Sequence, residues 1–103
     1  MSSKYSLSYL PVFEDDMMAV YDYIANTLRN PDAAYNLLEE TQKAILKRLD
    51  NPLISKPYHS LKDRRQPYYT IYVKNYIVFY VVIGDLMEVR RFIYAKRNLR
   101  EIV

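Results

Sequence analysis

A continuous apolar run, Tyr76 to Ile83, constrains the fold of this chain more than any other feature. It is much shorter than the roughly 20 residues that a helix needs to span a bilayer. A short run that is apolar at almost every position is typical of a strand in the interior of a sheet. Runs rich in β-branched and aromatic residues precede and follow it, Tyr68 to Val73 and Met87 to Tyr94. We therefore predict a three-strand meander in the C-terminal part of the chain.

Two short connections predict how the meander turns. Ile83-Gly84-Asp85-Leu86 places the only glycine of the chain at the first central position of a two-residue loop, which a type II′ hairpin favours. Val73-Lys74-Asn75-Tyr76 is a weaker turn signal, so it leaves the register of that hairpin open. Alternation along the last strand predicts two faces. One face is expected to carry Met87, Val89, Arg91 and Ile93, and the other Glu88, Arg90, Phe92 and Tyr94.

The N-terminal half has the periods of one strand and two helices. Apolar residues alternate with serines between Lys4 and Leu10, which predicts a half-buried strand. Apolar residues then recur at helical spacing from Phe13 to Leu28. Asn30-Pro31-Asp32 is a good helix start, and the helical spacing continues from there to Leu49. The short link between the two helices predicts an antiparallel helix hairpin.

Together these elements predict an α+β fold in the order β-α-α-β-β-β. Residues 1–103 are expected to form a single domain, because a chain of this length that is half apolar can bury one core. In so short a chain the helix hairpin can pack on only one face of a small, mostly antiparallel sheet. The other face of the sheet is therefore expected to remain available for binding.

Positive charge is concentrated in the C-terminal part of the chain. Residues 1–63 hold seven Lys or Arg against nine Asp or Glu, whereas residues 64–103 hold eight against three. Such segregation is typical of proteins that bind nucleic acid or an acidic partner, although an ordinary solvated face can have the same composition. The chain has no cysteine, no transmembrane run and no signal peptide, so we expect a cytoplasmic protein with no membrane partner.

The composition also argues against cofactor chemistry. A single glycine is incompatible with a glycine-rich phosphate loop, and no cluster of His, Cys or Asp has the spacing of metal ligands. We therefore predict neither a metal site nor a cofactor.

The order of the elements, with its basic last strand, resembles the RelE/ParE toxin superfamily across essentially the whole chain. Three segments carry the resemblance: Tyr69-Thr70-Ile71-Tyr72-Val73, Tyr76-Ile77-Val78-Phe79-Tyr80-Val81-Val82 and Arg91-Phe92-Ile93-Tyr94-Ala95-Lys96-Arg97. The resemblance implies the toxin of a type II toxin–antitoxin system, neutralised by a cognate antitoxin in a complex such as a heterotetramer. One branch of the superfamily enters the ribosomal A site and cuts mRNA, and the other inhibits DNA gyrase without cutting anything. The fold by itself does not choose between them.

Metal-independent RNA cleavage needs a base, an acid and a cation that stabilises the phosphorane. Arg91 and Arg97 match basic positions of the superfamily's last strand, Tyr94 matches a histidine sometimes found there, and Lys96 lies beside them. The resemblance thus implies a catalytic role for these four residues. The nucleic-acid contacts that we predict from the basic residues are Lys62, Arg64, Arg65, Lys74 and Arg90.

Other positions favour gyrase inhibition. Strand positions that often hold lysine or arginine in the ribonucleases hold Thr70, Tyr72 and Ile77 here. Val103 stands where some of them have a terminal aromatic. The only histidine, His59, excludes a catalytic pair of histidines. Our first hypothesis is a ribosome-dependent endoribonuclease whose partners are the ribosome and mRNA. The alternative is an inhibitor of DNA gyrase without nuclease activity.

Overall fold

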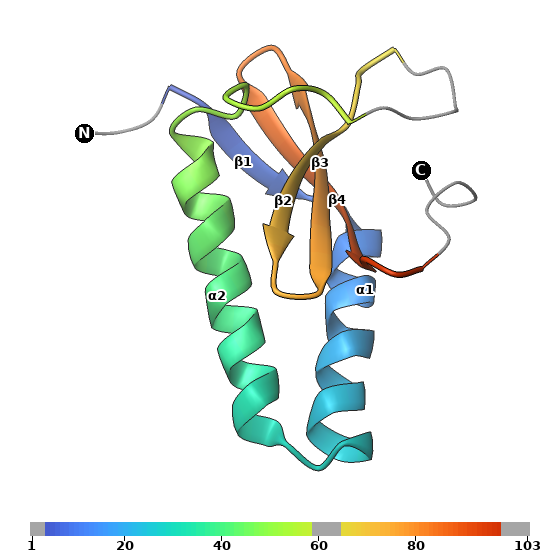
Figure 1. The fold of residues 1–103 in the computed structure, drawn as a ribbon. Helices are drawn as coiled ribbons and strands as arrows, with labels where there is room; N and C mark the ends of the chain where they lie inside the picture. Colours follow the sequence, from blue (N-terminus) through green and yellow to red (C-terminus); the bar gives the residue numbers. More distant parts are fainter. Residues whose placement is uncertain (1–3, 59–64, 98–103) are drawn as a thin grey trace.

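A computed structural model describes residues 4–58 and 65–97 of the chain. The elements follow the predicted order: β1 (Ser6–Tyr9), α1 (Pro11–Asp22), a π-helical turn (Tyr23–Thr27), α2 (Pro31–Leu49), β2 (Tyr69–Val73), β3 (Tyr76–Ile83) and β4 (Leu86–Tyr94). The two helices form an antiparallel hairpin that extends beyond one end of the sheet (Figure 1). The predicted α+β fold is confirmed. Within the described residues, no helix is both long enough and apolar enough to cross a membrane.

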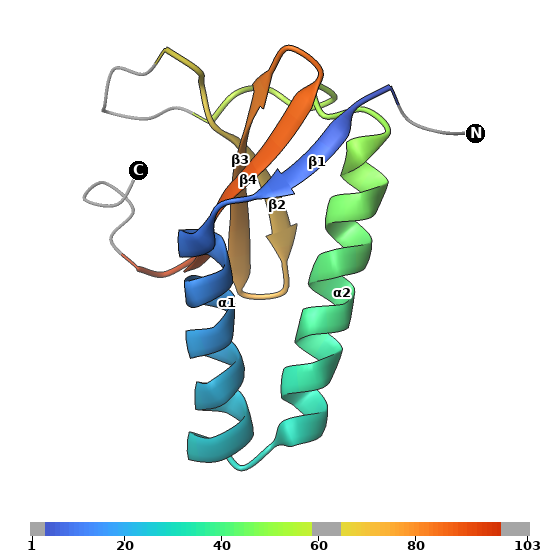
Figure 2. The ribbon, with the colours of Figure 1, turned by 180° about the vertical axis from the view of Figure 1, so that it is seen from behind.

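The four strands form one sheet in the order β1-β4-β3-β2. β2, β3 and β4 are the predicted antiparallel meander, and β3 is an interior strand. β1 pairs in parallel with β4, from Ser6 opposite Leu86 to Tyr9 opposite Val89. The first strand of the chain therefore lies beside the last (Figure 2). Beyond Val89, β4 continues without a partner from β1.

Local sequence explains where the helices begin. Pro11 and Pro31 each lie in the first turn of a helix, where the missing N–H costs no intrahelical hydrogen bond. Asn30 caps α2, because its Oδ1 accepts a hydrogen bond from the backbone N–H of Ala33 at 3.1 Å. The chain leaves the π-helical turn through Arg29, whose φ of 54° is in the left-handed region. The end of the π-helical turn and the start of α2 are therefore only a few residues apart, and this short link makes the helix hairpin antiparallel.

The larger core lies between the helix hairpin and one face of the sheet. It joins buried residues of both helices and of the last three strands: Phe13, Met17, Leu37, Ile45, Ile71, Val73, Val78, Tyr80, Met87, Val89 and Phe92. Burial of apolar side chains of this kind is the main favourable term in folding. Phe13, Met17, Leu37 and Ile45, which belong to the helical repeats predicted from the sequence, thus face the sheet.

The opposite face of the sheet is less open than the sequence predicts. A second buried cluster lies there, formed by Tyr68, Ile77, Phe79, Val81 and Ile93, none of them more than 6% exposed. Tyr58, which precedes β2, and Ala95, which follows β4, pack against this cluster. The expectation of a face free for binding is therefore wrong at the centre of the sheet, because segments outside the helices also cover it.

A β-bulge in β4 overturns the predicted alternation of its side chains. Phe79 of β3 lies opposite Arg91, whereas the next residue, Tyr80, lies opposite Val89, so Arg90 is the extra residue. One extra residue reverses the faces of all side chains beyond it. Phe92 therefore joins Met87 and Val89 in the core beneath the helices, and Ile93 lies in the cluster on the opposite face. The predicted grouping of Ile93 with Met87 and Val89 is wrong for this reason.

Both hairpins of the meander close with two-residue loops. Ile83 pairs with Leu86 around Gly84-Asp85, and Gly84 has a φ of 59°. Val73 pairs with Tyr76 around Lys74-Asn75, and Lys74 has a φ of 53°. In each loop only the first central residue has a positive φ, as in a type II′ turn. The second loop thus places a lysine in a conformation that favours glycine.

A buried polar network fastens the end of α2 to the sheet. The hydroxyl of Tyr80 donates to the carbonyl oxygen of Pro52 at 2.5 Å and accepts from Nη1 of Arg48 at 2.9 Å. The same Arg48 nitrogen donates to the carbonyl oxygen of Thr70 in β2 at 3.0 Å. Tyr80 is fully buried, so these partners supply the hydrogen bonds that water cannot.

Candidate functional site

Arg91 lies on the part of β4 that has no neighbour from β1. Its Nε donates to Oδ2 of Asp16 on α1 at 2.7 Å, and its Nη2 donates to Oδ1 at 3.1 Å. The backbone N–H of Phe92 donates to the same Oδ2 at 3.0 Å. The hydrogen bond with Asp16 raises the pKa of Arg91, and the guanidinium stays charged. One carboxylate from the helix thus occupies the open edge of β4 and engages a residue predicted to be catalytic.

Arg90 projects from the bulge and lies near another carboxylate. Its Nη2 is 3.8 Å from Oε2 of Glu88, and both side chains are mostly buried. The Nε of Arg90 is buried, and no other described residue offers it a hydrogen-bond partner. Glu88 lies opposite Val81, on the face away from the helix hairpin. This pair therefore joins a predicted nucleic-acid contact to the acidic residue nearest to it on the strand.

The remaining predicted residues of the last strand gather at its end. The backbone N–H of Ala95 donates to the carbonyl oxygen of Asn75 at 2.8 Å, which joins the segment after β4 to the loop between β2 and β3. Lys96, Arg97 and Lys74 are exposed on these two joined segments. Tyr94, also exposed, lies immediately before them. The structure thus brings together three of the four predicted catalytic residues and one predicted nucleic-acid contact.

The other predicted contacts are not part of this group. Arg65 is exposed ahead of β2, and no described residue forms an ion pair with it. Lys62, Arg64, His59 and Val103 lie outside the described residues. Within the described ranges, no three His, Cys, Asp or Glu residues come together as metal ligands could.

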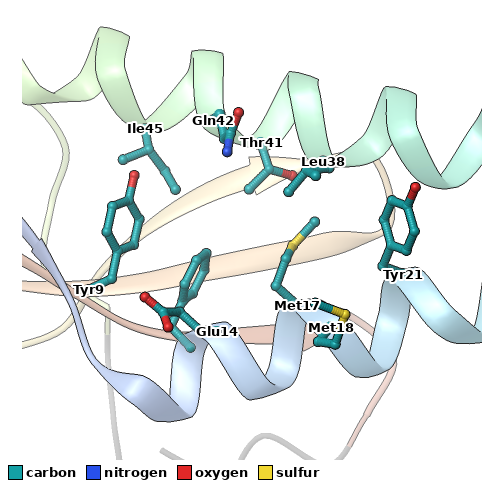
Figure 3. A pocket seen from close by; sticks show the side chains of 10 residues that line it. Tyr9, Glu14, Met17, Met18, Tyr21, Leu38, Thr41, Gln42 and Ile45 are labelled. Carbon is teal, nitrogen blue, oxygen red and sulfur yellow. The ribbon is translucent and has the colours of Figure 1, made fainter.

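A groove between the two helices was missed by the sequence reasoning. Its cavity volume is about 360 Å³, and its walls are mainly apolar (Figure 3). Its lining comes from both helices and from the end of β1: Phe13, Glu14, Met17, Met18 and Tyr21 of α1, Leu38, Thr41, Gln42 and Ile45 of α2, and Tyr9. A usable signal was present in the adjacent apolar pairs Met17-Met18 and Leu37-Leu38, which widen each helical stripe beyond the part that the sheet covers.

The lining of the groove combines packed and exposed side chains. Met17 and Ile45 are buried against the sheet, whereas Met18 is 59% exposed. Partial burial raises the pKa of Tyr9, so its hydroxyl is neutral near pH 7. Methionine side chains adapt easily to the shape of a partner. Glu14 is the one acidic residue in the lining. The groove is therefore suited to an apolar surface and not to an anion.

Comparison with known proteins agrees with this architecture. A family model described as the ParE toxin of the type II toxin–antitoxin system, parDE, matches residues 7–99. A chain from the chromosomal ParDE TA system of P. aeruginosa has a similar fold, with a TM-score of 0.68, 16% identity and coverage of 92% of this chain and 100% of that one. No curated protein sequence matches the chain.

Two solved structures of E. coli proteins are also similar. YafQ from E. coli strain BL21(DE3) has a TM-score of 0.51 and 16% identity, and the match covers 87% of this chain and 92% of that one. A chain of the E. coli DinJ-YafQ toxin-antitoxin complex has a TM-score of 0.52 and 18% identity, and the match covers 88% and 92% of the two chains. At such identities the structural likeness concerns the fold alone.

Proposed function

Because this chain belongs to the ParE toxin family and is the toxin of a type II toxin–antitoxin system, we propose that it inhibits DNA gyrase without cutting nucleic acid. This proposal reverses the order of the two hypotheses drawn from the sequence. The observation that carries it is the pairing of Arg91 with Asp16. A guanidinium that stabilises a phosphorane must approach the phosphate, but that of Arg91 is turned to a helix carboxylate by two hydrogen bonds.

The described part of the chain also offers no well-placed general base for RNA cleavage. Asp16 is engaged with Arg91, and Glu88 lies beside Arg90. A general base must come within hydrogen-bond reach of the attacking hydroxyl. Neither carboxylate lies on the segment that carries Lys96 and Arg97. Gyrase inhibition by binding needs no such base, and this favours the binding mechanism.

Cleavage of mRNA on the ribosome is the second candidate. The exposed group of Tyr94, Lys96 and Arg97 favours it, since these side chains offer cations and an aromatic ring that could meet RNA. Docking in the ribosome can also orient a substrate and so compensate for a sparse site.

One parallel experiment separates the two candidates. The purified chain is added to a gyrase supercoiling reaction and to a cell-free translation reaction in which mRNA ends are mapped. We expect inhibited supercoiling and intact mRNA. Lys43→Ala serves as the control for Arg97→Ala, because it removes an exposed cation from α2. Cuts within codons that require ribosomes and are lost in Arg97→Ala would overturn the gyrase proposal in favour of the ribonuclease.

The toxin has a cognate antitoxin, and we propose that an amphipathic segment of this antitoxin lies in the groove between α1 and α2. The groove supports this proposal because its lining is mainly apolar and includes Met18, which is largely exposed. Met18→Lys leaves the buried core untouched but places a charge in the apolar contact. Leu46→Lys is the matched control, since Leu46 is 56% exposed on α2 and does not line the groove.

In co-purification and binding measurements with the antitoxin, we expect Met18→Lys to weaken affinity at least tenfold, the effect of losing about 1.4 kcal/mol. Leu46→Lys should bind like the wild type. Equal affinities for the two variants would show that the antitoxin binds elsewhere on the toxin.

A further inference from the structure

Tyr76 and Tyr94 lie together at the end of the sheet that carries the loop between β2 and β3, and Tyr23 of the π-helical turn is close enough to Tyr76 to affect its ionisation. Tyr76 of β3 and Tyr94 of β4 are a cross-strand pair, and their ring centroids are 5.6 Å apart. Tyr76 also stacks on Phe92, with centroids 4.9 Å apart. Tyr23 begins the π-helical turn. Burial raises the pKa of Tyr76, and the nearby hydroxyls of Tyr94 and Tyr23 raise it further. We call Tyr23, Tyr76 and Tyr94 the tyrosine cluster.

The cluster has a packed base and exposed outer rings. Tyr76 is partly buried against Phe92, whereas Tyr23 is 52% and Tyr94 is 42% exposed. Irregular π-helical turns are frequent at functional sites, and here one carries Tyr23. The exposed rings of Tyr23 and Tyr94 therefore offer flat apolar faces to the solvent, and the ring of Tyr94 contacts that of the partly buried Tyr76.

Exposed cations lie next to this cluster. Lys74 is two residues before Tyr76, and Lys96 and Arg97 closely follow Tyr94 on the segment that is hydrogen-bonded to Asn75. Neither Lys96 nor Arg97 forms an ion pair with another described residue. Two carboxylates also lie near this group of residues, one of them beside a cation and the other beside a tyrosine. Nζ of Lys74 is 3.8 Å from Glu40, with both side chains more than half exposed, and Asp22 precedes Tyr23.

We propose that the tyrosine cluster and the adjacent cations Lys74, Lys96 and Arg97 form a binding surface for single-stranded nucleic acid. Bases stack on the exposed rings of Tyr23 and Tyr94, and phosphates contact the three cations. An acidic protein would need the cations but not the flat rings. A duplex hides its base faces, so the rings favour a single strand. This binding activity is separate from the proposed inhibition of gyrase, whereas in the ribonuclease alternative the same surface would contact mRNA.

The test is fluorescence anisotropy of labelled ten-nucleotide DNA and RNA strands of matched sequence with the purified full chain. Each strand is titrated at several salt concentrations, beside a DNA duplex and an acidic polyglutamate competitor. Tyr94→Ala and Tyr23→Ala should each weaken binding at least about fivefold, and Tyr94→Phe should bind normally, because it keeps the ring. Tyr72→Ala is the matched control, since Tyr72 is 67% exposed but lies opposite Ile77, on the other face of the sheet.

Salt dependence separates the cations from the rings. Three phosphate contacts predict a slope of about −2 in a plot of log affinity against log salt, and each of Lys74→Ala, Lys96→Ala and Arg97→Ala should reduce its magnitude by about 0.7. Tyr94→Ala should leave the slope unchanged. Lys43→Ala, which removes a charge from α2, is the control for both measurements.

The outcomes decide the proposal in either direction. Single-strand binding that is lost with the rings and the cations supports it, and the stronger of the DNA and RNA strands identifies the natural ligand class. Undetectable binding at low salt would overturn it. Three other results would show simple attraction of anions and would also overturn the proposal. They are unchanged affinity in the tyrosine variants, equal affinity for duplex and single strand, and displacement by polyglutamate at the same charge concentration.

Discussion

Removing the Asp16 carboxylate tests whether Arg91 has a structural role. Asp16 accepts three hydrogen bonds, two from Arg91 and one from the backbone of Phe92. Hydrogen bonds to charged groups typically stabilise a protein by about 1.5–3 kcal/mol each, but Arg91 keeps 24% exposure, so water recovers part of this. We expect Asp16→Ala to lower the free energy of unfolding by about 2–4 kcal/mol. For a domain of this size that is a fall in Tm of roughly 10–20 °C.

Urea denaturation followed by circular dichroism measures this loss. Arg91→Met should cost a similar amount, because it leaves Asp16 mostly buried without its ion-pair partner. The double variant should lose less than the sum of the single variants, with a coupling energy of about 1–3 kcal/mol. Glu39→Ala is the control, since it breaks an exposed ion pair with Lys43 that contributes little.

Two results would refute this reasoning. One is a midpoint for Asp16→Ala equal to that of Glu39→Ala, which would mean that the carboxylate does not hold β4. The other is additive effects of Asp16→Ala and Arg91→Met. If Arg91→Met instead keeps full stability and loses toxin activity, Arg91 serves the target directly.

The remaining predictions concern two tyrosines and one turn. Tyr80→Phe should lower the free energy of unfolding by about 1–3 kcal/mol in urea denaturation, since Arg48 and the carbonyl of Pro52 each lose their hydrogen bond with the hydroxyl. Lys74→Gly should raise the free energy of unfolding by up to about 1 kcal/mol, and with it Tm, because a φ of 53° suits glycine. A lower Tm would contradict this. Burial raises the pKa of Tyr76 and of Tyr80 in the folded state. Stability is therefore retained below the unfolded pKa of 10.0 and falls as pH rises past it; an unchanged urea midpoint between pH 8 and pH 11 would refute the shift.

Most of the fold could be predicted because local signals and burial agree. Asn30-Pro31 marks the start of α2, and the apolar run Tyr76 to Ile83 lies in the interior of the sheet as expected. The bulge at Arg90 was not predicted, although the adjacent arginines Arg90-Arg91 interrupt the alternation of β4; the pairing with β3 decides which residue is extra. A single extra residue then reversed the expected faces of Phe92 and Ile93.

The candidate site was only partly predictable for a related reason. Composition marks Arg91 and Arg97 equally as cations, but only the folded chain brings Asp16 to Arg91, 75 residues away in the sequence. The tyrosine cluster likewise combines residues from the π-helical turn and two strands, and the spacing of these residues in the sequence does not predict it. The groove depends on how far the helices separate, which is a property of their packing on the sheet.

The pairing of β1 with β4 has a consequence for folding during synthesis of the chain. Residues 6–9 can find their strand partner only after residues 86–89 have been made. Long-range pairing of this kind raises contact order and slows folding. During translation, most of the chain therefore emerges before its N-terminal strand can join the sheet. A product that stops short of β4 lacks the strand that connects β1 to β3, and so a truncated synthesis yields no complete sheet.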